Sequence, residues 1–239
     1  MLLVFITACG GEAFKEDTND SNSTLLMTEQ TGEEGSDNCV MIPYYDDVTY
    51  SQTDRYPTTG TVTNTIIQYS RTKDSTTNDK VHMNIEISSN KSPTIRVAVE
   101  IEQFYTTTRD GRYRDVTKRL EVSTTNQGIT AHSETNFSPS LREFREKLCQ
   151  GQSYTTTYIE TIKSNIAPIT TSSHTLARTV ESIHESKIVP AGTFVTVRIK
   201  NMDTKLTWIT WKDIKTGITV AREGPTHAME LLSYNVGKN

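Results

Sequence analysis

Apolar and polar residues alternate strictly over two neighbouring segments, and this alternation constrains the fold more than any other feature of the chain. Val81, Met83, Ile85 and Ile87 alternate with polar side chains, and residues 95–101 repeat the pattern. A period of two places successive side chains on opposite faces of a strand. The intervening residues 89–92 (Ser-Asn-Lys-Ser) are typical of a turn. The sequence therefore predicts an antiparallel β-hairpin with one buried and one solvated face.

Threonine accounts for 40 of the 239 residues, whereas hydrophobic residues make up only 34%. Threonine is β-branched, so it loses rotamer freedom on a helix but fits a pleated, half-exposed strand. This composition argues against a helical bundle. The chain also has no run of about 20 apolar residues, which excludes a membrane protein built from spanning helices.

Further strands and turns follow the first hairpin. Asp110-Gly111 suits the positive φ angles of a tight turn, and Asn126-Gln127-Gly128 marks another break. Together they predict a meander of antiparallel strands. The other segments with strand character are 104–108, 113–122, 153–163, 193–200, 205–211 and 217–222.

One short helix is predicted near residues 140–149. Ser140 and Glu143 have the spacing of a capping box, and Leu141, Phe144 and Leu148 would share one helical face. Residues 174–188 are ambiguous, since their apolar spacing is helical and their composition favours a strand. The expected fold class is mainly β, an antiparallel β-sandwich-like body with this single helix.

Charge divides the chain into two unlike parts. Between Gly10 and Asp47 the sequence holds ten carboxylates against the single Lys15, a net charge of −9. Because the whole chain carries −4, the residues from Val48 onward carry +5. The acidic part is also poor in aromatic residues, so it buries too little apolar surface to offset its ordering entropy. We expect residues 9–38 to form a flexible tether and residues 39–239 to form a single β-rich domain.

The first eight residues are apolar and end abruptly at a cysteine. Ile6-Thr7-Ala8-Cys9 resembles the lipobox of bacterial lipoproteins. The resemblance implies that residues 1–8 are a signal peptide and that Cys9 carries lipid, palmitate included. Signal peptides begin with basic residues, and no Lys or Arg precedes Cys9, so we expect this signal peptide to be truncated at its N-terminus. The residue that follows Cys9 is Gly10 and not Asp, which by analogy with this family implies sorting to the outer membrane. The alternative is an ordinary buried first strand.

The expected pairing of the remaining two cysteines follows from this resemblance. If Cys9 carries lipid, Cys39 and Cys149 are left as one candidate disulfide bond in an oxidising compartment. Such a bond would join the end of the tether to the middle of the folded body. Two free buried thiols are the alternative.

Most enzyme signatures are absent from the sequence: it has no G-x-S-x-G elbow, no Gly-rich phosphate loop, no H-E-x-x-H and no paired C-x-x-C. The nearest approach to a metal site is Glu181, His184 and Glu185, of which Glu181 and His184 would share a face only on a helix. We therefore expect no catalytic residue, no metal site and no cofactor.

A basic cluster surrounds the predicted turn at Asp110-Gly111, and its cations flank an aromatic residue. Guanidinium groups beside an aromatic ring suit phosphates or acidic glycans, although an ordinary solvated hairpin has the same composition. On an envelope protein such a cluster suits lipopolysaccharide, a glycan or an acidic protein partner, not nucleic acid. The candidate ligand-binding residues are Arg109, Arg112, Tyr113, Arg114, Lys118 and Arg119.

Four aromatic residues lie on predicted strands: Tyr154, Tyr158, Trp208 and Trp211. Exposed, they would suit glycan stacking or a protein contact, and buried, they belong to the core, which we expect for the two tryptophans. The segment Val189 to Val197, a Pro-Ala-Gly turn feeding an alternating strand, is similar to a pattern in aerolysin-type pore-forming proteins. That resemblance implies Ser/Thr-rich strands around a membrane-inserting hairpin.

The sequence therefore predicts a bacterial protein at the outer membrane or cell surface, held there by lipid on Cys9, with a binding or structural role and no catalysis. An aerolysin-type membrane-active protein is the alternative. An envelope enzyme of unknown chemistry is the third reading.

Overall fold

The structure is a computed structural model that describes residues 28–30, 38–43, 47–57, 59–73, 77–90, 94–109, 112–145, 147–204 and 206–236. These residues form β-strands and turns without an α-helix, so the prediction of a mainly β protein is confirmed. Within the same ranges, no helix has the length and apolar character needed to cross a membrane.

The described residues form fifteen strands, most of them ten or more residues long. They are β1 (Thr28–Gln30), β2 (Cys39–Met41), β3 (Asp47–Tyr56), β4 (Thr61–Lys73), β5 (Asn78–Ser89), β6 (Ile95–Thr107), β7 (Tyr113–Thr125), β8 (Thr130–Phe144), β9 (Lys147–Cys149), β10 (Ser153–Ser164), β11 (Thr170–Val189), β12 (Gly192–Asp203), β13 (Leu206–Asp213), β14 (Thr219–Glu223) and β15 (Ala228–Val236).

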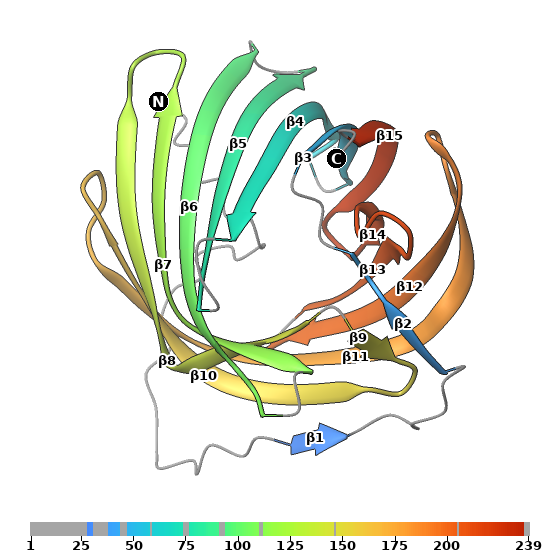
Figure 1. Cartoon of the computed structure of the whole chain (residues 1–239). Helices are drawn as coiled ribbons and strands as arrows, with labels where there is room; N and C mark the ends of the chain where they lie inside the picture. The colour runs from blue at the N-terminus through green and yellow to red at the C-terminus, as the bar shows by residue number, and fades with distance from the viewer. Residues whose placement is uncertain are drawn as a thin grey trace.

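Twelve of these strands form one closed antiparallel barrel, which Figure 1 shows as strands curving into a ring. The order runs from β10 through β15 to β3 and on to β8. β8 then pairs with β10, from Ser138 opposite Ile159 to Ser133 opposite Ser164, and this closes the ring. β1, which lies within the predicted tether, pairs with the other end of β10, with Thr28 opposite Thr155.

The prediction of a β-sandwich is wrong, because the main sheet closes on itself instead of forming two facing sheets. A sandwich needs two sheets with free edges, whereas here the edge strands β8 and β10 pair with each other. The predicted hairpin at 81–101 is confirmed as β5 and β6, with Ile85 opposite Val97. The break at 126–128 is also confirmed, and Gly128 has a φ of 78° there. Asp110-Gly111 lies outside the described residues.

One face of the sheet is identified as the interior by a cluster that crosses the barrel. Tyr105 of β6, Tyr158 of β10 and Leu176 of β11 are buried together, and Trp208 of β13 packs against them. Since β6 and β13 are six strands apart in the barrel order, these side chains meet across the inside. Alternation along each strand then assigns the other residues to the inner or the outer face.

The prediction of a helix at 140–149 is wrong. Residues up to Phe144 belong to β8, where Glu143 lies opposite Arg114, and Leu148 belongs to β9. The three residues expected on one helical face do not stay together, because Leu141 joins the Tyr105 cluster, whereas Leu148 and Phe144 pack with β11 and β12. Pairing with β7 therefore outweighs the local capping pattern.

The ambiguous stretch 174–188 is part of the strand β11. Two irregularities in its pairing with β12, one on each side of Ser182, interrupt the alternation and produce the helix-like spacing. Glu181 and His184 therefore do not share a helical face. Glu181 and Glu185 instead contact Arg198 at 3.3 and 3.8 Å.

A disulfide bond between Cys39 and Cys149 joins the short ladder of β2 and β9, as the sequence predicts. Leu148 of β9 and Ile42 after β2 pack with Val180 and Ile199 of β11 and β12. Val180 shares a face with Leu176, so the ladder lies against the inner face of the barrel wall.

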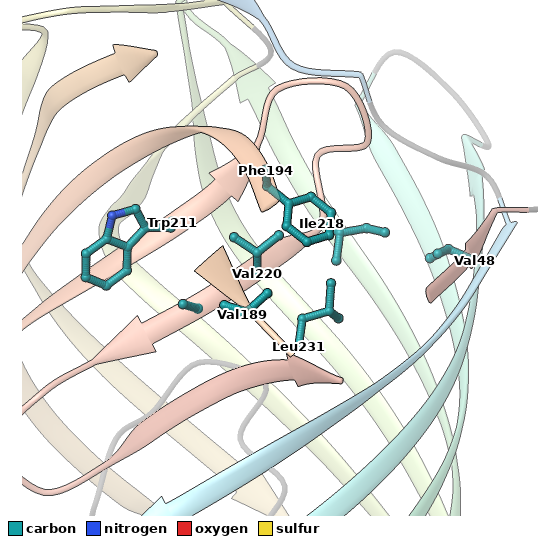
Figure 2. Packing of buried hydrophobic residues seen from close by; sticks show 8 residues of the cluster. Val48, Val189, Phe194, Trp211, Ile218, Val220 and Leu231 are labelled. Carbon is teal, nitrogen blue, oxygen red and sulfur yellow. The ribbon is translucent and has the colours of Figure 1, made fainter. Parts of the chain in front are cut away.

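A separate apolar cluster joins β11 and β12 to β13, β14, β15 and β3 (Figure 2). Val189 and Phe194, from the segment that resembles aerolysin-type proteins, are buried in it with Trp211 and Leu231. The tip of this hairpin is bonded to β15, since the Ala191 N–H donates to the Leu231 carbonyl at 3.1 Å.

The disulfide bond is expected to stabilise the fold by restricting the unfolded chain. It closes a separation of 110 residues, so replacing Cys39 and Cys149 together by alanine should lower the free energy of unfolding by about 2–5 kcal/mol. Urea denaturation measures the loss, and Cys9→Ala is the matched control with unchanged stability. A wild-type protein whose gel mobility does not change on reduction would contradict the bond.

Candidate functional site

The six residues of the predicted basic cluster do not form one surface. Arg109 is exposed, whereas Tyr113 is fully buried. Lys118 points outward and pairs with Glu134 at 3.0 Å. Arg114 and Arg119 point into the barrel, where they meet carboxylates from other strands. Whether any of the six binds a ligand stays a prediction.

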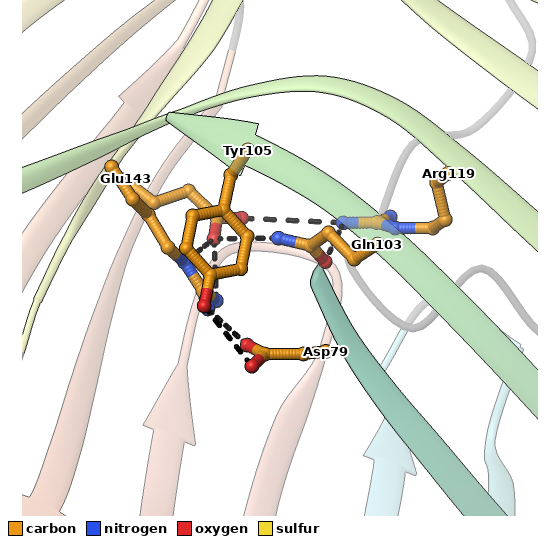
Figure 3. A network of polar contacts seen from close by, with 6 residues as sticks. Asp79, Gln103, Tyr105, Arg119 and Glu143 are labelled. Carbon is orange, nitrogen blue, oxygen red and sulfur yellow. Dashed lines mark hydrogen bonds and ion pairs between the residues drawn. The ribbon is translucent and has the colours of Figure 1, made fainter. Parts of the chain in front are cut away.

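Arg114 is the most tightly held of these cations. Its Nε donates to Glu143 Oε2 at 2.8 Å, and its Nη1 donates to Asp79 Oδ2 at 3.1 Å. Asp79 also accepts a hydrogen bond from the Tyr105 hydroxyl at 3.1 Å, and Gln103 Nε2 donates to Glu143 at 3.2 Å. Figure 3 shows Asp79, Gln103, Tyr105, Arg119 and Glu143 converging from β5, β6, β7 and β8. We call Asp79, Gln103, Tyr105, Arg114, Arg119 and Glu143 the polar network.

Glu143 is the centre of the polar network. Burial by itself would raise the pKa of Glu143, but Arg114, Arg119 and Arg178 outweigh it and lower that pKa to about 2. The carboxylate is therefore ionised at neutral pH although it is buried. Three guanidinium groups around one buried carboxylate supply the hydrogen bonds and charge that such burial requires.

A second ion pair lies on the opposite face of β7 and β8. Arg142 binds Asp115 with both ends of its guanidinium fork, at 2.8 and 3.0 Å, and lies over the Tyr113 ring. Tyr113 in turn contacts Phe144 and Tyr154. Tyr113 and Phe144 thereby pack the ends of β7 and β8 against Tyr154 of β10.

The polar network borders an apolar inner wall. Ile67 of β4, Ile85 of β5, and Val97, Val99 and Ile101 of β6 are buried together. Residues 97, 99 and 101 have the parity of Tyr105, so they face the interior. Every described member of this cluster comes from β3, β4, β5 or β6.

The apolar inner wall is only partly covered. Val81, Met83, Ile87 and Ile95 belong to the same inner face, and each keeps part of its surface exposed. Solvent therefore reaches this part of the interior. By contrast, the β11 and β12 side of the barrel is covered by the disulfide-linked ladder.

A histidine bridges two carboxylates farther round the interior. His174 lies 3.5 Å from Asp203 and 3.6 Å from Glu160, and its ring stacks on Tyr158. The hydrogen bond with Asp203 raises the pKa of His174 and lowers that of Asp203. Protonated His174 thus stabilises the fold below pH about 6.5, and this contribution is lost as the pH rises through its raised pKa.

The four aromatic candidates belong to the core. Tyr154, Tyr158 and Trp211 are buried, and Trp208 packs against the Tyr105 cluster. Among the residues that the structure describes, no group of three or more His, Cys, Asp or Glu is placed to hold a metal ion. Cys9 lies outside the described residues, so its lipidation stays a prediction.

Replacing Glu143 by glutamine is expected to destabilise the protein strongly. The change removes the buried counter-charge of Arg114, so the free energy of unfolding at pH 7 should fall by about 3–5 kcal/mol. The pKa of Glu143 is lowered, so its stabilisation is present above pH about 4.5 and is lost as the pH falls toward 2. The difference between variant and wild type should therefore shrink at pH 3, as urea denaturation at both values measures.

Glu100→Gln is the matched control for this measurement. Glu100 lies on the outer face of β6 with its side chain 68% exposed, so its replacement should change stability little at either pH. Equal losses in the two variants would contradict a special role for the Glu143 carboxylate.

No protein family matches the chain, and no curated protein matches it. A crystal structure of a "Beta-barrel-like Protein of Domain of Unknown Function DUF1849 from Brucella abortus" is similar to 82% of this chain and 100% of that chain, with a TM-score of 0.44 and 6% sequence identity.

Proposed function

We propose that this protein is a non-catalytic binding protein of the bacterial cell envelope, held at the membrane by lipid on Cys9, whose ligand occupies the barrel interior. The supporting observation is the apolar inner wall of β4, β5 and β6. Val81 and Met83 face inward there and still keep exposed surface. Apolar side chains accessible to solvent on a concave surface are typical of binding sites for apolar ligands.

The size of the barrel supports the same proposal. Eight strands enclose an interior that side chains alone can fill, and wider barrels leave room for a ligand or a plug. This barrel has twelve strands, and the ladder of β2 and β9 covers the side formed by β11 and β12. The wall formed by β4 to β6 has no such cover among the described residues.

The lipid anchor is tested by metabolic labelling. Cells expressing the chain behind a complete signal sequence and grown with a fatty-acid analogue should label the wild-type protein, because the lipobox resemblance places acyl chains on Cys9. The Cys9→Ala variant should not be labelled. Equal labelling of both proteins would overturn the anchor.

Binding in the interior is tested with N-phenyl-1-naphthylamine, a neutral dye that fluoresces in apolar surroundings. The wild-type protein should bind it, and Met83→Trp should weaken binding by about tenfold or more because the larger ring occupies the interior. Asn84→Trp is the matched control, since Asn84 is the next residue of β5 and is exposed on the outer face.

The control variant should bind the dye as the wild type does. Thermal unfolding of the three proteins shows whether each is folded. An absence of dye binding by the folded wild type, or equal weakening by Met83→Trp and Asn84→Trp, would contradict a binding site inside the barrel.

A further inference from the structure

The apolar inner wall and the polar network form one continuous surface along β5. Its inner face reads Ile87, Ile85, Met83, Val81 and then Asp79. From Asp79 to Ile87 the strand advances eight residue steps, a length of about 26 Å. The surface is therefore apolar over most of its length and becomes charged at one end.

The polar end of this surface extends across three strands. Asp79 lies opposite Gln103, and Gln103 lies opposite Arg119. The row beside it is formed by Val81, Ile101 and the next inward residue of β7, Glu121. A ligand with one apolar chain and one polar end would match this division of the inner face.

Arg119 is the cation of the polar network that is held least tightly. Its Nη2 donates to Gln103 Oε1 at 3.3 Å and lies 4.0 Å from Glu143, beyond hydrogen-bonding distance. Arg114, by contrast, has two carboxylates within 3.1 Å. A guanidinium group carries five N–H donors, so Arg119 keeps donors for an acceptor that enters the barrel. Its side chain is 18% exposed, which gives such an acceptor access.

Glu121 carries one of the negative charges near Arg119, the others being those of Glu143 and Glu160. Burial raises the pKa of Glu121, and the attraction of Arg119 opposes that rise, so the two groups interact. An acidic ligand bound at Arg119 would meet Glu121 as a like charge. Removal of this carboxylate should therefore strengthen the binding of an acid, whereas removal of Arg119 should weaken it.

Resting on the proposed function, we infer that the ligand is a single-chain amphiphile with a carboxylate head group. Its hydrocarbon chain lies along Val81, Met83 and Ile87, with Ile95 beside them, the inner residues of this wall that keep exposed surface. Its head group accepts hydrogen bonds from Arg119. Charge-assisted pairing of a guanidinium with a carboxylate selects an acid over an alcohol of the same chain length.

The test measures displacement of N-phenyl-1-naphthylamine by sodium dodecanoate and by dodecanol. The wild-type protein should bind dodecanoate about tenfold or more tightly than dodecanol, because a hydrogen bond to a charged group in a desolvated site is stronger than a neutral one. Arg119→Gln should lower dodecanoate affinity to the level of dodecanol. Glu121→Gln should raise dodecanoate affinity and leave dodecanol affinity unchanged.

Arg96→Gln is the matched control, because Arg96 lies on the outer face of β6 and pairs there with Glu86 at 2.8 Å. It should keep the preference of the wild type for dodecanoate. Equal binding of acid and alcohol by the wild type, a preference that survives in Arg119→Gln, or a preference that is lost in Arg96→Gln would each overturn the inference. In all three cases dye binding still supports an apolar site, whereas failure of the dye to bind contradicts the proposed function itself.

Discussion

The pairing of β8 with β10 is the constraint on which the rest of the structure depends. Because of this pairing the sheet encloses an interior, and its strands have one face toward that interior and one face toward solvent. Tyr105, Tyr158 and Leu176 can pack together because this pairing brings β6, β10 and β11 around one space. Without closure, the inner wall of β4 to β6 would be an exposed apolar sheet face, which soluble proteins avoid.

Closure also explains why the interior tolerates charge. Arginines from β7 and β11 and carboxylates from β5 and β8 point into the same enclosed region, where each reduces the cost of burying the other. Glu143 stays ionised because its attraction to the neighbouring arginines outweighs the cost of burying its charge. The interior is thereby divided into a paired charged zone and an open apolar zone, and Arg119 lies at their boundary.

Part of this arrangement could be predicted from the sequence. The β5 and β6 hairpin followed from strict alternation, and the Cys39 to Cys149 bond followed from the count of cysteines left beside Cys9. The basic cluster contained Arg114 and Arg119 but not their partners, since Asp79 and Glu143 lie 35 and 29 residues from Arg114. No local pattern marks a residue as the partner of another that far away. The helix at 140–149 failed for a related reason, because the capping spacing is local and the pairing of β8 with β7 is not.

The sequence by itself determined that the chain forms long antiparallel strands, which face of several strands is apolar, and where some of the turns fall. Those properties depend on side chains two residues apart, so they can be read from one segment at a time. Only the tertiary structure decided that the sheet closes into a barrel, that β2 and β9 cover one side of its interior, and that charges from four strands meet inside it. These depend on the register between segments far apart in the chain, which pairing across the whole sheet sets and no single segment encodes.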